Sequence, residues 1–266
     1  AGNYAVEPAL EYTRSAQLAL TEFAPGNSFY AGGHKHVIDT LEIGTADEPL
    51  YETWRLCPEC GFGEIELEGE PPTSCPRCGM ISIADTGSRH TMLRLRTAMA
   101  SSSEENARVF DERDERDRER YEVVRTIDCD PAHITNAWAL GETAFGAELS
   151  GQTRMRTINV GFSERRGEQL FIAGEEEHVT RFHVCRHCGA VKDVRDDKKG
   201  TRPDRLHLGW CKVRSGAKPE QWDAVLLLHE LVTEAVRLLL PVSMFEVDER
   251  LASFKGALLL GLREDF

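Results

Sequence analysis

The chain has 266 residues, and its 45 acidic and 32 basic side chains give a formal net charge of −13 at pH 7. A chain of this length can bury a sizeable core without help from a metal, and it has room for one large domain or two modest ones. The negative charge argues against this segment wrapping nucleic acid by itself, because phosphate binding depends on clustered Lys and Arg. No apolar run approaches the roughly eighteen residues of a membrane span, so no membrane association is expected.

The first expected element is a helix that begins near Pro8 and carries apolar residues at helical spacing as far as Phe23. Two strand-like segments follow, and they flank Gly32-Gly33, which is a two-residue hairpin signal. We therefore expect residues 1–50 to form a connector made of this helix and hairpin.

Two Cys-Pro-x-Cys-Gly motifs come next, and 14 residues separate the last cysteine of the first from the first cysteine of the second. Their thiols belong to Cys57, Cys60, Cys75 and Cys78. Zinc prefers four sulfur or nitrogen ligands in a tetrahedron, and each Cys-x2-Cys pair supplies two of them from one tight turn. A redox pair would need only one such motif, and residues 64–68 between the two motifs alternate like a ribbon strand. The sequence therefore predicts a structural zinc ribbon over residues 51–85.

Short strand-like segments recur between residues 86 and 183, and they predict an antiparallel sheet. The segments are 92–99, 121–127, 154–162, 169–173 and 180–184. Within this region residues 104–120 are almost continuously charged and can form ion pairs four residues apart, which predicts a short solvated helix. Cys129 stands alone at an expected strand end, and its default interpretation is a buried, inert thiol.

A second metal site is predicted in the later part of the chain, with three thiols and one imidazole as ligands. Its expected ligands are Cys185, Cys188, His207 and Cys211. The last two stand four residues apart, so one helical turn would bring them together. Two alternatives remain open: His183 or His187 completes the shell while Cys211 is a buried thiol, or the site is open with water as fourth ligand, as in catalytic zinc. No general base at zincin-like spacing accompanies the site, which favours a structural ion.

Residues 221–240 carry only a narrow polar stripe, which predicts a largely buried helix that ends before Pro241. A second helix runs to the end of the chain, and its apolar face carries Leu251, Phe254, Leu258 and Leu262. We expect residues 184–266 to form one zinc-binding domain. Because Ala1 stands where an initiator Met would and the last helix has no glycine cap, the chain is expected to be an internal fragment, truncated within this domain.

These elements predict an α+β fold, with an antiparallel β-rich middle that includes a zinc ribbon, followed by a second zinc site packed on C-terminal helices. Two zinc ions are expected. Thiolate ligands without a disulfide pattern fit a reducing compartment, so a cytoplasmic location is expected.

Four runs of the sequence carry a resemblance to a known family. They are residues 18–26 (LALTEFAPG), 57–78, 181–189 (RFHVCRHCG) and 228–241 (LHELVTEAVRLLLP). The chain resembles the C-terminal region of large DEAD/DEAH-box helicases that carry an MrfA-type zinc-binding domain, and residues 253–262 are similar to the start of that domain's core. Related regions also occur in a helicase-associated subunit of the DISARM antiphage system.

The resemblance implies a zinc-bearing accessory module behind two RecA-like motor domains, which would couple ATP hydrolysis to movement on DNA. The chain holds no G-x-x-x-x-G-K-[ST] loop, so neither ATP binding nor catalysis is expected from it alone. ATP would bind only in motor domains, either in the same chain or in a helicase subunit. The alternative is a motorless zinc-binding scaffold of an antiphage defence complex. An independent zinc hydrolase is disfavoured, because few acid and base residues converge.

Overall fold

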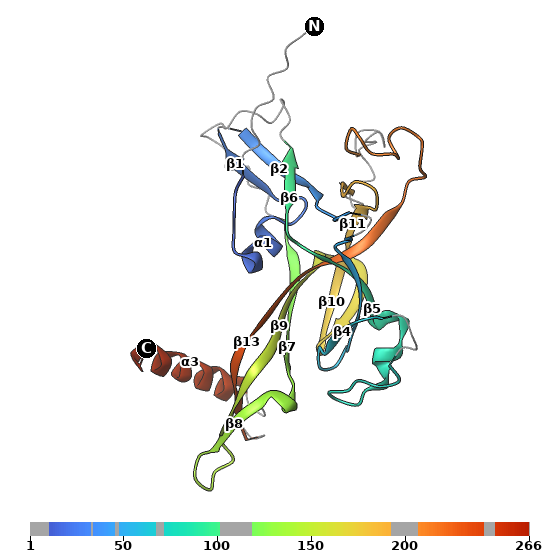
Figure 1. Ribbon diagram of the computed structural model, residues 1–266. Helices are drawn as coiled ribbons and strands as arrows, with labels where there is room; N and C mark the ends of the chain where they lie inside the picture. The colour runs from blue at the N-terminus through green and yellow to red at the C-terminus, as the bar shows by residue number, and fades with distance from the viewer. Residues whose placement is uncertain are drawn as a thin grey trace. The chain divides into compact units, whose positions relative to one another are not determined.

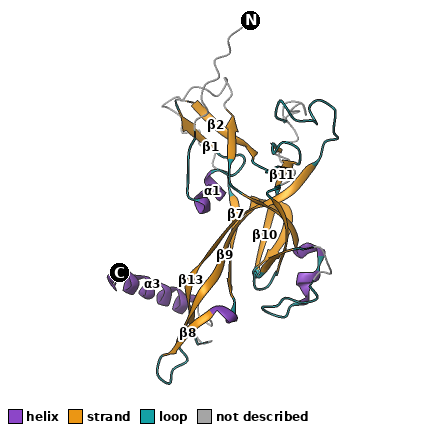
Figure 2. Cartoon of the chain, viewed as in Figure 1, coloured by secondary structure: helices purple, strands orange, loops and turns teal. Residues whose placement is uncertain are grey.

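The computed structural model describes residues 11–32, 34–45, 48–67, 72–101, 119–192, 207–241 and 248–265. Most of them lie in strands (Figures 1 and 2), and antiparallel pairing dominates, so the predicted α+β class with a β-rich middle is confirmed. The chain divides into two compact units. One comprises Ala1–Thr126 and Arg156–Glu230, and the other comprises Ile127–Met155 and Leu231–Phe266.

The N-terminal part forms a short helix and a three-stranded sheet, as the hairpin signal predicts. Its elements are α1 (Ala16–Glu22), β1 (Ser28–Ala31), β2 (His34–Leu41) and β6 (Ala98–Ser101), with the strand order β1-β2-β6. Residues 11–15 are not helical, so within the described residues the helix is shorter than predicted. Leu20 is the buried residue of α1, and a short helix with so little packing gains too little to extend further.

A larger sheet has the strand order β10-β9-β13-β5-β3-β4. These strands are β3 (Tyr51–Leu56), β4 (Gly63–Ile65), β5 (Arg89–Arg94), β9 (Gly146–Ile172), β10 (Glu175–Thr180) and β13 (Trp222–Leu239). Further strands pair at its margins: β7 (Tyr121–Cys129), β8 (Ile134–Ala139), β11 (Phe182–Cys185) and β12 (Val191–Lys192). Short 3-10 turns are η1 (Ile81–Ala84), η2 (Thr86–Ser88) and η4 (Pro131–His133).

The helix predicted over residues 221–240 is wrong, because this segment is strand β13. Residues 225–228, near the start of this strand, are buried on both faces of the sheet: Leu226 and Leu228 belong to one core cluster, whereas Val225 and Leu227 belong to another. A strand covered on both faces is continuously apolar, and periodicity alone does not distinguish such a run from a buried helix. The second metal site therefore adjoins a strand rather than a C-terminal helix.

Two further expectations differ from the structure. The separate strands predicted at 154–162 and 169–173 are both parts of β9, which pairs with β10 through a register shift that leaves residues 164–168 between the paired stretches. The charged Ser163–Glu168 stretch resembles a turn in sequence, yet the chain continues as an irregular strand. The solvated helix predicted over 104–120 lies outside the described residues, except for its last two positions.

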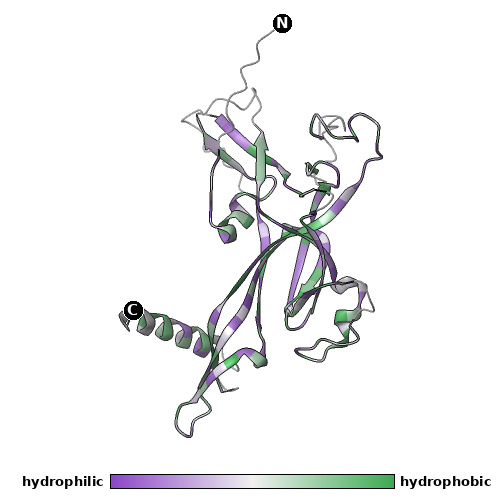
Figure 3. Cartoon of the chain, in the orientation of Figure 1, coloured by the Kyte–Doolittle hydropathy of each residue, from purple (hydrophilic) through white to green (hydrophobic). Residues whose placement is uncertain are grey.

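The predicted last helix is confirmed as α3 (Asp248–Asp265). Among its described side chains, Leu251, Phe254 and Leu258 are half-buried, and all three belong to the predicted apolar face; the side chain of Leu262, the fourth predicted member, is not described. The ring of Phe254 lies 6.3 Å from that of Phe145. Leu259 and Leu260 are exposed. In Figure 3 hydrophobic and hydrophilic colours alternate along this helix. No helix among the described residues is both long enough and apolar enough to cross a membrane.

Candidate metal centres

Three turns with the same backbone design carry six of the eight ligands: two turns carry all four ligands of the first group, and the third carries the first two ligands of the second group. In each turn a glycine donates its N–H to the carbonyl of the cysteine four residues earlier: Gly61 to Cys57 at 3.1 Å, Gly79 to Cys75 at 2.8 Å and Gly189 to Cys185 at 2.9 Å. Each cysteine N–H in turn donates to the carbonyl five residues later, at Phe62 (2.7 Å), Met80 (2.8 Å) and Ala190 (2.8 Å). The glycines have φ values of +72°, +78° and +79°, which other residues adopt only at a cost. The Cys-x2-Cys-Gly pattern thus encodes one ligand-presenting turn three times.

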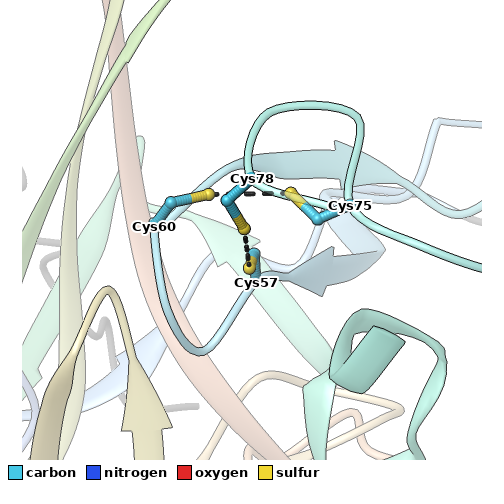
Figure 4. A group of neighbouring side chains, drawn as sticks. All are labelled: Cys57, Cys60, Cys75 and Cys78. Carbon is cyan, nitrogen blue, oxygen red and sulfur yellow. Dashed lines mark hydrogen bonds between the residues drawn. The ribbon is translucent and has the colours of Figure 1, made fainter. Parts of the chain in front are cut away.

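The first cysteine group has the geometry of a tetrahedral zinc site. Figure 4 shows the four side chains with their sulfur atoms turned toward one another. All four sulfur atoms lie within 4.8 Å of one another. The Sγ atoms of Cys57 and Cys78 are 3.5 Å apart, and those of Cys60 and Cys75 are 3.6 Å apart. Four ligands at a Zn–S distance of about 2.3 Å would stand about 3.8 Å apart, whereas a disulfide requires about 2.05 Å. The four predicted ligands of the zinc ribbon are therefore brought together, and none of them forms a disulfide.

The thiols of this group differ in their electrostatic surroundings. Burial raises the pKa values of Cys57 and Cys60, so without a cation their thiolate forms are disfavoured at neutral pH. Cys78 is exposed, and the backbone N–H of Met80 holds the pKa of this thiol below its ordinary value. The group therefore has a buried side and a solvent-facing side.

Arg55 holds the segment that follows the second turn. Its side chain is 8% exposed, and its Nη1 donates to the carbonyls of Ile83, Ala84 and Asp85 at 3.0–3.2 Å. Its Nε donates to Oε1 of Glu66 at 2.9 Å. The Arg89 guanidinium, and then Arg55, hold the pKa of the Glu66 carboxyl below its usual value. Sequence reasoning missed this support, because an arginine within a strand carries no local signal for it.

The second group comprises Cys185, Cys188, His207 and Cys211, all of them buried, with their ligand atoms also within 4.8 Å of one another. His207 Nδ1 lies 3.7 Å from the sulfur of Cys188 and 3.8 Å from that of Cys211. About 3.6 Å is expected between nitrogen and sulfur ligands of one tetrahedral zinc ion. The helical turn predicted between His207 and Cys211 is wrong: these residues lie in a loop, where the Cys211 N–H donates to the carbonyl of Leu208 at 2.9 Å.

The alternative imidazoles do not join this group. His183 lies in β11, where burial, more than the nearby Lys192, holds its pKa below the usual value. His187 contributes its backbone N–H, which lies 3.4 Å from the sulfur of Cys185. Burial raises the pKa of Cys185 to about 12, and an amide donor near the sulfur partly offsets that effect.

Two side chains from outside the sequence pattern surround His207. The ring of Trp222 stacks on the imidazole with centroids 4.9 Å apart. Oε1 of Glu220 lies 3.4 Å from the buried Nε2, within ion-pair distance although not aligned as a hydrogen bond. When Nδ1 binds a metal ion together with the sulfurs, Nε2 carries the proton, and a carboxylate is the usual partner of that nitrogen in metal-bound histidines. Neither residue has a sequence signal beyond its nearness to Cys211.

Each group supplies four ligands, which closes a tetrahedral shell and leaves no position for a substrate. The two groups are thus positioned to hold two zinc ions in structural roles. Cys129 belongs to neither group. It ends β7 as predicted, but it is half-buried rather than buried, with its sulfur 3.5 Å from Oγ1 of Thr153. Comparison of the chain with protein-family models, curated proteins and solved structures finds no match in any of the three.

Proposed function

We propose that this chain is the zinc-bearing accessory region of an ATP-dependent DNA helicase, in which it acts as a structural and DNA-guiding module. The accessory role rests on one observation: each cysteine group offers four protein ligands, which is typical of structural zinc sites rather than catalytic ones. The helicase assignment is supported by the resemblance of four runs of the sequence, two of which contain cysteine turns. The thiolate ligands of both cysteine groups suit a reducing compartment, so the proposal places the protein in the cytoplasm.

In this proposal the zinc turns stiffen the ends of strands in a sheet that would contact the motor domains. The first turn follows β3 directly and the third follows β11 directly, so each ion would fix the end of a strand. ATP would bind in RecA-like motor domains, in the same chain or in a helicase subunit, and DNA would be contacted together with them. Rigid strand ends would transmit a motor movement without unfolding.

The first test is to read the coding frame upstream of Ala1 to its start codon. A phosphate-binding loop followed by an acidic strand motif would support the helicase. In the full-length protein, Cys185→Ser should then reduce strand separation much more than DNA-stimulated ATP hydrolysis, whereas Cys129→Ser, outside both groups, should change neither. Equal loss of both activities would argue against a coupling role.

The second candidate is a motorless zinc-binding scaffold of an antiphage defence complex. The net charge of −13 favours it, because an acidic surface suits a protein partner better than a phosphate backbone. An upstream frame without a phosphate-binding loop, together with copurification of a separate helicase, would select this candidate.

A further inference from the structure

A cavity of about 560 Å³ opens beside α1, and no metal-centre residue lines it. Its walls come from the end of α1, the following turn, β1 and the residues that lead into β7; α1 and β1 are labelled in Figure 1. The aromatic part of the lining is Phe23, Phe29, Tyr30 and Tyr121. The volume falls within the range of about 300–1,000 Å³ that is typical of ligand sites.

The wall of the cavity that Tyr121 forms is anchored on the core. The ring of Tyr121 lies 5.4 Å from Phe162 and 5.9 Å from Phe182, which both belong to a buried cluster, and its hydroxyl donates to the carbonyl of Pro25 at 2.8 Å. Asn27 ties two walls together, because its amide donates to the carbonyl of Thr21 and accepts the N–H of Glu119. An anchored wall lowers the entropic cost of binding.

The carboxylate of Glu22 lines the cavity beside the aromatic rings, and a cationic side chain of the chain itself already contacts it. The guanidinium of Arg14 lies 3.0 Å from Glu22 and 5.9 Å from the centroid of the Phe23 ring. A carboxylate next to an aromatic face is the combination that recognises guanidinium groups. Arg14 is about half exposed, and an exposed ion pair of this kind contributes little, so it can be displaced.

We propose that this cavity binds an arginine side chain from a basic segment of a partner protein, in competition with Arg14. The partner's guanidinium takes the carboxylate and ring contacts that Arg14 now makes, and the rest of the cavity accommodates neighbouring residues of the segment. Aromatic linings also stack nucleic-acid bases, but the Glu22 carboxylate and the net charge of −13 oppose a phosphate backbone.

The test uses a fluorescein-labelled Gly-Arg-Gly-Arg-Gly peptide and fluorescence anisotropy at physiological ionic strength. The comparison probes are the same peptide with citrulline, which keeps the shape without the charge, and an eight-nucleotide oligothymidine. We expect binding of the arginine peptide and at least about tenfold weaker binding of the other two. Glu22→Gln should weaken binding about threefold to fivefold, while Glu175→Gln, an exposed carboxylate on β10, should leave it unchanged.

Arg14→Ala is the decisive variant, because it removes the internal competitor. We expect it to tighten peptide binding by up to about fivefold, whereas Arg263→Ala makes the same charge change on α3 and should have no effect. Zinc content and melting temperature report whether each variant is folded. Equal effects of the two arginine variants, equal binding of the citrulline peptide, or preferential binding of oligothymidine would each overturn the proposal.

Discussion

Gly174, in the turn between β9 and β10, donates its backbone N–H to the carbonyl of Pro58 at 2.6 Å, which joins the first cysteine turn to the β9–β10 hairpin. The adjacent Ala173 N–H donates to the carbonyl of Cys57 at 3.4 Å. A zinc ion held by the cysteine turn would therefore stabilise more than the ribbon, because the cysteine turn is hydrogen-bonded to the turn that connects β9 and β10.

Two glycines provide a matched test of this docking. Gly61 and Gly79 occupy the same position in their turns, with φ of +72° and +78°, so replacement by alanine costs each turn about 1–2 kcal/mol. A Cβ at Gly61 would also lie 2.8 Å from Ala173 and 2.9 Å from Thr126, whereas a Cβ at Gly79 meets nothing within 4 Å. Gly61→Ala should lower the free energy of unfolding by roughly a further 1–3 kcal/mol. Equal losses in urea denaturation would show that the turn does not dock tightly.

Glu220 should set the strength of the second zinc site. Removing a carboxylate partner of a metal-bound histidine typically costs about 10–100-fold in metal affinity. We expect Glu220→Gln to lower the affinity for one of the two zinc ions by that factor, measured by competition with a chromogenic chelator. Glu234→Gln, an exposed carboxylate on β13, is the control. A Glu220 variant with unchanged affinity for both ions would exclude the interaction with His207.

The two sites should lose zinc at different rates. Cys78 is exposed in the first group, whereas all four ligands of the second group are buried, so a chelator can reach only the first without local opening. Zinc release to excess EDTA should therefore show two phases. In Cys57→Ser the fast phase should disappear, and in Cys185→Ser the slow phase should disappear. The reverse assignment would contradict the burial argument.

The arrangement of the cysteine groups was the most predictable part of this molecule. Glycine at the fifth position of each turn and two cysteines three residues apart are local requirements, so the sequence displays them directly. His207 was found by its spacing from Cys211, although a loop rather than a helix brings the two together. Strand β13 was mistaken for a helix because its burial on both faces depends on partners distant in sequence, such as Met92 of β5. The roles of Arg55 and Glu220 likewise depend on contacts that only the folded chain creates.

His90 makes the fold sensitive to mild acid. It is 1% exposed, neither ring nitrogen has a hydrogen-bond partner among the described residues, and burial, followed by the charge of Arg181, lowers its pKa to about 4. The unfolded chain, with a pKa near 6.5, binds this proton more readily. The contribution of the neutral ring to the free energy of unfolding is therefore complete above about pH 6.5 and is lost as the pH falls toward 4.

The shift from 6.5 to about 4 corresponds to about 3 kcal/mol in full, of which about 1.4 kcal/mol is lost by pH 5.5. In urea denaturation with excess zinc, His90→Leu should lose about that much less stability than the parent chain between pH 7 and pH 5.5. Parallel pH profiles for the two proteins would show that His90 titrates normally.

Zinc content, measured by mass spectrometry on the reduced, purified chain and three variants, tests the central claim most directly. We expect two ions per chain in the parent and in Cys129→Ser, and one ion each in Cys57→Ser and Cys185→Ser, because each variant opens one tetrahedral shell. Fewer than two ions in the parent, or loss of the same ion in both site variants, would contradict the presence of two independent zinc centres.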